Sequence, residues 1–427
     1  MPTQLITLPC SDLLLGMYVC ELDRPWTETP FPVKGFHIRR IEDLETLRLF
    51  CKQVVIDTTR GVSPRRQRAA NLTILSSARK RSPPVAEIAV SHDVYKITGA
   101  VKQEIDTVER LYQELSTLYD KVIISARNDK PLRLASLTRV SGGIRNSIIR
   151  CPDAFIWFLN TNSHDSCLLN HSLRAAVWSL LLTRHIGYST ADMDVVFLGT
   201  LLADIGMAKL PESLVRKTGG FGRREYLAYR KHVRMGEDLL RIEGEVDNNV
   251  TSIVRAHHER HDGLGFPRGQ RGDQIPVMAR IANLAYCYDR LLKHGARGVT
   301  VAPANAVRRL YKQRKLKFTE QLVFEFIQVL GLYPAGSIVE LTSREIAIVV
   351  EQNPGEKLQP KIALVTDDNK SLLKKPRLVN PVDNKSAADN WTVIRALELG
   401  SYAIQPENLR EEIFGKRIGI GKFGVRV

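Results

Sequence analysis

The sequence predicts a multidomain α+β protein, with a small β-rich N-terminal domain, an all-α helical bundle and a short β-rich C-terminal extension. Two switches in the spacing of apolar residues predict this order, because strands and helices repeat with different periods. Short apolar runs give way to helical spacing, and strand-like runs return beyond Pro334. We predict the boundaries at 1–60 for the β-rich domain, 61–93 for a linker, 94–139 for a connecting helical segment, 140–345 for the bundle, and 346–427 for short strands and a polar, basic tail.

The N-terminal part is predicted to be β-rich from its short apolar runs. Tyr18–Cys20 and Val54–Asp57 are typical of strands and lie on either side of the turn-like stretch Trp26–Pro32. Residues 61–93 contain arginine, serine and proline with no apolar period, including Ser82–Pro84. Such a composition is typical of a linker between domains.

A long helix is predicted next, because apolar side chains recur every three or four residues from Ile97 to Val122. The stripe fits two arrangements. It can face the core of its own chain, or it can meet a second copy in a coiled-coil-like homodimer. The sequence leaves both arrangements open.

The central part has helical spacing almost throughout, and strand-like runs follow it. The predicted helices are Leu168–Leu182, Met193–Ile205, Tyr226–Leu240, Val246–His258, Val277–Leu292 and Ala304–Leu316. The predicted strands are Ser337–Leu341, Ile346–Val350 and Lys361–Val365. From about residue 367 the chain is polar and basic, with an amphipathic stretch from Trp391 to Leu399, and we expect a tail there.

The composition limits the function classes. A net charge of +16 favours anionic partners. The basic runs show neither zinc-finger spacing nor an RNA-binding aromatic motif, so a nucleic-acid partner is not expected. No apolar run approaches the length of a membrane span, and the first residues lack the pattern of a signal peptide. Six scattered cysteines without a CxxC pair indicate free thiols, so we expect a cytoplasmic protein.

Histidines mark the candidate site. Seven of the ten fall between residues 164 and 261, in helices that look buried. A buried imidazole needs a partner, and a metal ion is a common one. The seven are His164, His171, His185, His232, His257, His258 and His261.

Two segments supply the strongest candidates for this site. An apolar helix stripe runs into His257 and His258, and the glycines and proline of 263–267 then end the helix in a tight loop. A second apolar helix ends in one carboxylate, Asp204, which must be paired, hydrogen-bonded or metal-bound if it is buried. Taken alone, His171 and His232 would more often be structural residues than metal ligands.

Taken together, these segments resemble the HD-GYP family, a branch of the HD hydrolase superfamily whose active members open cyclic di-GMP. The resemblance covers about residues 140–345. It rests on the signature His257-His258-Glu259, Asp262-Gly263 and Gly265-Phe266-Pro267, with phenylalanine for the usual tyrosine. Residues 1–60, with Gly16-Met17-Tyr18-Val19 and Asp23-Arg24-Pro25-Trp26, resemble the small uncharacterised domain that often precedes HD-GYP domains.

The resemblance implies a helical bundle around a centre of two or three metal ions, usually iron or manganese. Five residues stand at the family's ligand positions, and Asp204 among them is also the catalytic candidate: His171, Asp204, His232, His257 and His258. Three family positions are substituted, with Ala203 for a histidine ligand, Tyr286 for an aspartate ligand and Met207 for a lysine. The family's phosphate-binding basic pair matches Gly295 and Gly298, although a small shift would bring in Arg297.

By the family's pattern, the substitutions at Ala203 and Tyr286 damage one metal site and leave the other with three histidines and one carboxylate. We therefore expect iron or manganese, with one ion as an alternative to two, and weak or absent hydrolysis. Three functions stay open. The first is a sensor or protein-interaction module, for which cyclic di-GMP and a protein bound at the HD-GYP surface are both candidate partners. The second is an active phosphodiesterase giving pGpG or GMP, in which His261 or His171 rebuilds the centre or one metal ion suffices. The third is a basic binder of nucleic acid or membrane surfaces.

Overall fold

The computed structural model describes residues 5–14, 16–24, 35–38, 41–61, 88–162, 168–217, 221–244, 246–293, 301–353, 356, 358–383 and 391–416. These residues fall into two compact units, drawn from 1–83 with 353–358 and from 84–352 with 359–427. The turn-like stretch at 26–32, most of the predicted linker, His164 and the positions 295–298 lie outside the described residues.

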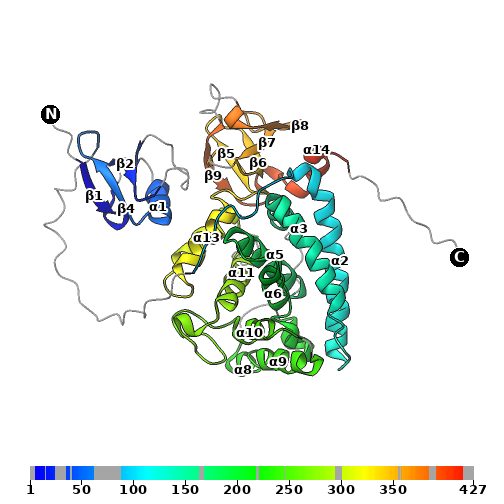
Figure 1. Ribbon diagram of the computed structural model, residues 1–427. Helices are drawn as coiled ribbons and strands as arrows, with labels where there is room; N and C mark the ends of the chain where they lie inside the picture. The colour runs from blue at the N-terminus through cyan, green and yellow to red at the C-terminus, as the bar shows by residue number, and fades with distance from the viewer. Residues whose placement is uncertain are drawn as a thin grey trace. The chain divides into compact units, whose positions relative to one another are not determined.

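The N-terminal unit is an antiparallel sheet with one helix, in agreement with the predicted β-rich domain (Figure 1). Its strand order is β1-β4-β2-β3, so the last strand in the sequence pairs with the first. The helix is formed because Leu44, Leu47 and Phe50, three residues apart, bury one face. The elements are β1 (Leu5–Pro9), β2 (Tyr18–Leu22), β3 (Phe36–His37), α1 (Ile41–Phe50) and β4 (Gln53–Asp57).

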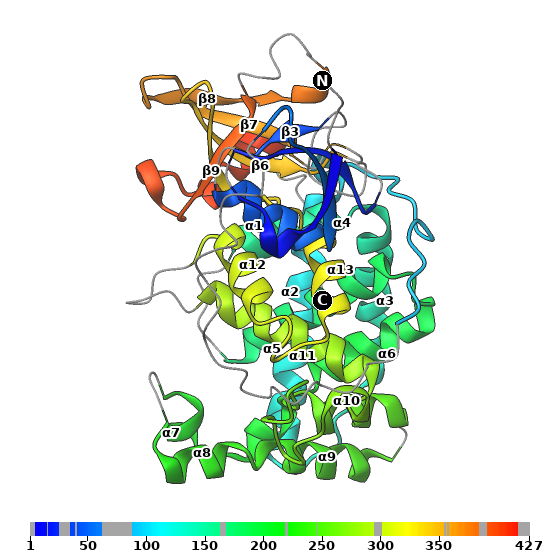
Figure 2. The same ribbon diagram turned by 90° about the vertical axis from the view of Figure 1, so that its left-hand side faces the viewer.

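The second unit is built on a helical body with α5 at its centre (Figures 1 and 2). Every side chain of α5 from 171 to 182 is buried, because α6 and α11 pack against it. The larger helices are α2 (Val101–Arg127), α3 (Ala135–Arg150), α4 (Pro152–Thr161), α5 (Leu168–His185), α6 (Thr190–Leu201), α9 (His232–Glu243), α10 (Asn248–Ala256), α11 (Val277–Lys293), α12 (Pro303–Lys312) and α13 (Glu320–Leu330). Short turns are η4 (Ile205–Lys209), α7 (Glu212–Val215), α8 (Arg223–Tyr229) and η5 (Gly272–Gln274).

The long helix α2 runs along the whole helical body in Figure 1 and packs on α3, α4 and η4. Most of the predicted stripe is buried within the chain itself, with Tyr119 beside it, whereas Ile97 lies before the helix and is 49% exposed. The buried members of the stripe are Val101, Ile105, Val108, Leu111, Leu115 and Val122. Just beyond its end, Asp129 forms an ion pair with Lys209 of η4, with Nζ and Oδ1 2.5 Å apart. The stripe is thus occupied inside one chain, and a homodimer stays a prediction.

One predicted helix, Tyr226–Leu240, is broken in the structure into α8 and α9. The break falls at residues 230 and 231, after Tyr229 and before His232. At this junction the Nδ1 atom of His232 lies 2.6 Å from the carbonyl oxygen of Tyr229, so the imidazole donates a hydrogen bond to a carbonyl at a helix end. The apolar spacing continues across residues 230 and 231, so periodicity alone does not reveal this break.

A five-stranded antiparallel sheet closes the second unit, and the predicted boundary at 345 falls between two of its strands. The order is β8-β7-β6-β5-β9, with β5 (Ile338–Leu341), β6 (Ile346–Glu351), β7 (Lys361–Thr366), β8 (Leu372–Val379) and β9 (Val393–Leu397). The segment that the sequence predicts as a polar tail therefore supplies both edge strands. Edge strands commonly carry charges and proline, as Lys374, Lys375 and Pro376 of β8 illustrate.

The sheet is fixed to the helical body through α4 and the short helix α14 (Arg410–Phe414). The Asn160 side chain of α4 donates to the carbonyl of Ala335 at 2.8 Å. Arg410 forms ion pairs with Asp106 and with Glu109 of α2. In Figures 1 and 2 the sheet lies at one end of the body, and α8 and α9 lie at the other. Among the helices described, none combines the length and apolar content of a membrane span.

Candidate metal centre

Asp204 is the carboxylate of the candidate centre, and it lies in the turn between α6 and η4. Its side chain is buried, with 5% of the residue exposed. The turn approaches α9 closely because the next glycine has no side chain. A Cβ atom at Gly206 would lie 2.0 Å from the carbonyl oxygen of His232. Glycine at this position therefore allows Asp204 and His232 to come together.

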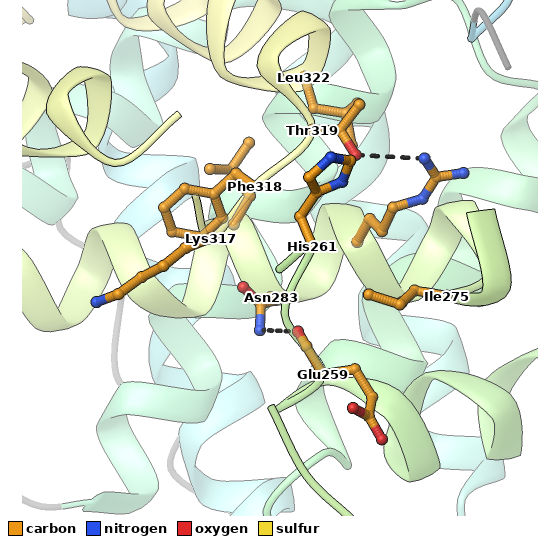
Figure 3. Close-up of a pocket in the computed structure, with 10 residues that line it drawn as sticks. Glu259, His261, Ile275, Asn283, Lys317, Phe318, Thr319 and Leu322 are labelled. Carbon is orange, nitrogen blue, oxygen red and sulfur yellow. Dashed lines mark hydrogen bonds between the residues drawn. The ribbon is translucent and has the colours of Figure 1, made fainter. Parts of the chain in front are cut away.

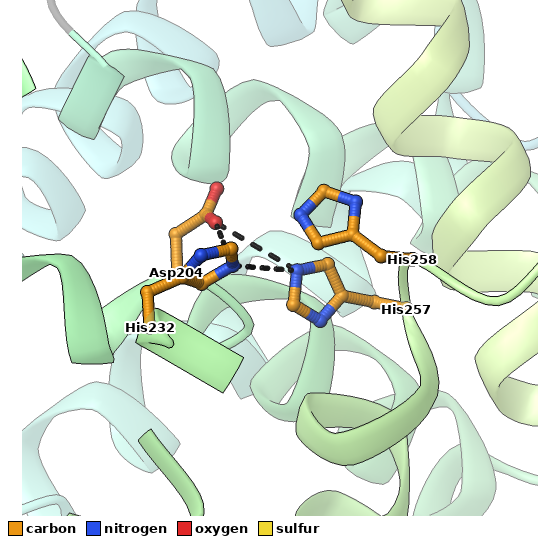
Figure 4. Close-up of side chains that lie close together, drawn as sticks. All are labelled: Asp204, His232, His257 and His258. Atoms are coloured by element: carbon orange, nitrogen blue, oxygen red, sulfur yellow. Dashed lines mark hydrogen bonds and ion pairs between the residues drawn. The ribbon is translucent and has the colours of Figure 1, made fainter. Parts of the chain in front are cut away.

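His232 and His257 turn the same ring nitrogen towards Asp204 (Figure 4). His232 opens α9 and donates from Nδ1 to the carbonyl of Tyr229. His257 follows α10, and its Nδ1 lies 2.8 Å from the carbonyl of Val254. Because each Nδ1 carries the proton for these bonds, each Nε2 presents a lone pair. The two Nε2 atoms lie 3.3 Å and 3.7 Å from Oδ1 of Asp204.

These three atoms fit a divalent metal ion. The Nε2 atoms of His232 and His257 are 3.5 Å apart, so with Oδ1 of Asp204 they form a nearly regular triangle. A point equidistant from its corners lies about 2.0 Å from each, which is a metal–nitrogen bond length. Oδ1 of Asp204 is buried and has no hydrogen-bond donor, so a cation satisfies it. His258 completes a group of four whose ligand atoms all lie within 4.8 Å of one another.

The protonation states also suit metal binding. Burial is the main cause that lowers the pKa of His232 to about 4. Burial and the neighbouring imidazoles lower the pKa of His258 well below its usual value. For Asp204, burial acts to raise the pKa, but the adjacent imidazoles of His257 and His232 outweigh it and hold the pKa below its usual range. Neutral imidazoles and an ionised carboxylate are the forms that bind a metal.

The adjacent half of the site contains no comparable donor at the two substituted positions. Ala203 is buried and has only a methyl group. The Tyr286 ring lies between candidate ligands, with its centre 4.0 Å from that of His171 and 5.3 Å from that of His258. Burial raises the pKa of Tyr286 well above its usual value, so the phenol stays neutral. Met207, which stands where the resemblance implies a lysine, places a buried apolar side chain in η4.

His171 lies beside this group and not in it. Its Nδ1 bonds to Asp289 of α11 at 2.6 Å, and its buried Nε2 has no hydrogen-bond partner. Asp289 also accepts from Arg174 at 2.6 Å and from Trp178 at 3.3 Å. Asp289 is not among the residues predicted from the sequence, although, like Asp204, it is a single carboxylate in an apolar helix. The metal role of His171 stays a prediction.

The part of the signature that follows His258, residues 259–267, forms the signature loop. This loop shapes the site and supplies none of the four candidate ligands. The Glu259 carboxylate accepts from the backbone nitrogens of Arg268 and Gln270, at 2.7 and 3.0 Å. Gly265 lies so close to the preceding turn that a Cβ atom would be 2.5 Å from the carbonyl oxygen of His258. The Phe266 ring stacks on His258, with ring centres 4.4 Å apart.

Two further loop residues, Asp262 and Gly263, set the turn. Asp262 accepts from the backbone nitrogen of Leu264 at 3.0 Å and pairs with Arg260. Gly263 has a φ of +77°, a left-handed conformation that favours glycine. The loop residues thus hold His258 and its stacked ring in place.

A small cavity lies behind the loop, beside His261 (Figure 3). Its volume is about 10 Å³, which is room for one water molecule and not for a nucleotide. Arg280 and Thr319 bond to each other at its edge, 3.2 Å apart. His261 thus faces a different space from the four candidate ligands, and its Nδ1 is buried without a hydrogen-bond partner.

The chain is similar to known protein families in two regions. Residues 161–322 match the family model of the HD domain, and residues 5–137 match a domain of unknown function, DUF3391. The chain thus contains an HD domain with DUF3391 before it, as the resemblance to HD-GYP proteins predicts.

The curated relatives are bacterial phosphodiesterases. A cyclic di-GMP phosphodiesterase of Pseudomonas aeruginosa is 25% identical over 83% of this chain and 84% of its own length. A cyclic di-GMP phosphodiesterase response regulator of Xanthomonas campestris is 30% identical, over 34% of this chain and 38% of its own length. The solved structure of an HDG"Y"P protein from Bdellovibrio bacteriovorus covers 77% of this chain and 99% of that one, with 15% identity and a TM-score of 0.46.

Proposed function

We propose that this chain is a cyclic-di-GMP signalling protein that binds the dinucleotide at a one-metal centre and hydrolyses it weakly or not at all, acting as a sensor or interaction module. One observation carries the proposal. Four candidate ligands converge at Asp204, while Ala203 and Tyr286 occupy the two positions that would serve a second ion. The relatives named as cyclic di-GMP phosphodiesterases support the choice of ligand.

The proposed ligands are Asp204, His232, His257 and His258. Nitrogen and carboxylate donors suit iron and manganese, the metals that the resemblance implies. A bound ion supplies positive charge for a phosphate oxygen, whereas in-line hydrolysis uses a second ion to help generate and place the hydroxide. With one ion the centre retains an affinity for the phosphodiester and loses the usual source of its nucleophile.

Nearby side chains fit a binding role. Phe266 stacks on His258 and fixes its ring beside the centre. The neutral Tyr286 phenol fills space that water or a second ion would need. The guanidinium of Arg290 lies 6.0 Å from the centre of the Tyr286 ring and places a further positive charge near the site. A phosphate that reaches the metal therefore also approaches a cation of the protein.

A second candidate function, an active phosphodiesterase, is favoured by a specific observation. The Nε2 atom of His171 is buried and has no hydrogen-bond partner, so it presents a lone pair that a second ion would satisfy. In this alternative, His171 replaces a lost ligand, and the protein forms pGpG or GMP from cyclic di-GMP.

One experiment separates the two functions. The full chain is purified without chelator or air, supplied with Fe(II) or Mn(II), and tested for both binding and turnover of cyclic di-GMP beside the double variant His257→Ala/His258→Ala. We expect binding with little or no turnover, and loss of both bound metal and dinucleotide in the variant. Turnover that disappears in the variant would establish the active enzyme instead. A folded variant with full metal content would refute the ligand assignment.

A further inference from the structure

A second cluster of metal-ligating side chains lies outside the centre at Asp204. His92 precedes α2, His185 ends α5 and Glu325 lies in α13. The Nε2 atoms of both histidines approach the same carboxylate oxygen, Oε2 of Glu325, at 2.8 and 3.1 Å. The ligand atoms of these three residues all lie within 4.8 Å of one another. Residues far apart in the sequence thus converge on one point.

The backbone around His92 is held in place independently of the cluster. Ile88 exchanges two hydrogen bonds with the side chain of Gln321, at 2.9 and 2.8 Å. The backbone nitrogen of Ser91 donates to the carbonyl of Ile186 at 3.0 Å. The Tyr95 hydroxyl donates to the carbonyl of Tyr188 at 2.7 Å. These bonds fix the segment on both sides of His92, so the histidine is already placed beside its two partners.

We propose that His92, His185 and Glu325 form a second metal site, which binds one divalent transition-metal ion of the zinc class. Two imidazoles and one carboxylate are a common protein donor set for zinc, with water in the remaining position. Donor atoms around such an ion lie about 3.3 Å apart, close to the observed nitrogen–oxygen distances. Metal binding therefore needs only small side-chain movements.

The exposure of the cluster suits ion entry and a bound water. The His92 side chain is 42% exposed and that of His185 is 22% exposed, whereas Glu325 is 11% exposed. The carboxylate thus lies at the buried bottom of the site, and the imidazoles lie at its solvent-exposed edge. As exposed ion pairs alone, such contacts would contribute little stability. A metal ion changes this, because it joins three separate segments through coordinate bonds.

The site would fasten the segment 88–95, which leads into α2, to the end of α5 and to the middle of α13. This segment includes the last residues of the predicted linker, 88–93, so zinc would determine how firmly the start of the second unit is held. The proposal is independent of the function proposed for the centre at Asp204, because the two clusters share no residue.

The test measures zinc bound by the full chain after equilibrium dialysis against Zn²⁺ alone. The variants are His92→Ala, the double variant His257→Ala/His258→Ala and, as a matched histidine control, His37→Ala in the N-terminal unit. We expect His92→Ala to lose one zinc equivalent, or to bind it more than about 100-fold more weakly, since even outer residues of metal sites contribute about 10–100-fold. The control should bind as the unaltered protein does.

Hydrogen exchange at residues 88–95 gives a second reading that does not depend on counting ions. Zinc should slow exchange there in the unaltered protein and in His257→Ala/His258→Ala, and not in His92→Ala. Equal zinc binding by His92→Ala and the unaltered protein, or exchange at 88–95 that zinc leaves unchanged, would overturn the proposal. Full zinc content in the double variant would instead count against the centre at Asp204, so the two failures are distinguishable.

Discussion

Replacing the buried Asp153 by asparagine should stabilise the protein at alkaline pH. Asp153 lies in the first turn of α4, is 6% exposed, and accepts a hydrogen bond from the backbone nitrogen of Gln352 at 2.8 Å. Burial raises its pKa from 3.8 to about 7, with a smaller contribution from Glu351 and opposition from the Gln352 bond. An asparagine oxygen can accept the same bond without carrying a charge.

The direction of this pH dependence follows from the raised pKa of Asp153. Between pH 3.8 and about 7 the folded chain holds a proton on Asp153 that the unfolded chain has lost. The stability from this group is therefore fully present below 3.8 and is lost as pH rises to 7. At pH 8 the cost reaches about 4 kcal/mol, and between pH 5 and pH 8 it grows by roughly 2–3 kcal/mol.

The assay is urea unfolding of the unaltered protein and of Asp153→Asn at pH 5 and pH 8, with chelator throughout. We expect the advantage of the variant to widen by that amount at the higher pH, and any constant effect of the amide cancels in the comparison. Asp368→Asn, at an exposed turn of the C-terminal sheet, serves as the control and should show no such widening. An equal advantage at both pH values would refute the reasoning.

Three further substitutions test other parts of the structure. Gly206→Ala should lower the free energy of unfolding by about 1–3 kcal/mol and reduce bound metal, because its Cβ atom would lie 2.0 Å from a backbone oxygen. The control Gly142→Ala, whose Cβ atom would have its nearest neighbour at 3.7 Å, should change neither. Equal melting temperature and metal content in Gly206→Ala and the unaltered protein would contradict this prediction. Ala203→His with Tyr286→Asp should raise the rate of pGpG formation, whereas an unchanged rate would show that these donors are insufficient. Arg410→Ala should lower the free energy of unfolding by about 2 kcal/mol, because a nearly buried ion-pair partner of Asp106 and Glu109 is lost. An unaltered melting temperature would show that these ion pairs do not stabilise the contact.

The order of the domains was predictable because it depends on local periodicity. The switch from strand-like runs to helical spacing and back is visible in the apolar residues, and the structure follows it. The edge strands β8 and β9 were not predictable in this way. Their outer faces are polar, so an alternation that marks a half-buried strand is weak or missing. The sequence pattern there resembles a tail, and only pairing with β7 and β5 gives it structure.

The candidate site was predictable only in part. His257 and His258 are adjacent in the sequence, and Asp204 ends an apolar helix, so both drew attention without a fold. The structure brings these residues together with His232, but it places His171 against Asp289. That pairing joins positions 118 residues apart, and no local pattern encodes it. The cluster at Glu325 escaped sequence analysis for the same reason, because tertiary packing alone assembles it.

The helix α2 is one continuous helix that extends between the two ends of the second unit. With 27 residues it is about 40 Å long. Arg410 forms an ion pair with Asp106 near the start of this helix. The ion pair between Lys209 and Asp129 links its other end to η4, the turn that follows Asp204. The same helix therefore contacts, through ion pairs near its two ends, both the short helix α14 beside the C-terminal sheet and the turn that follows the carboxylate of the candidate centre.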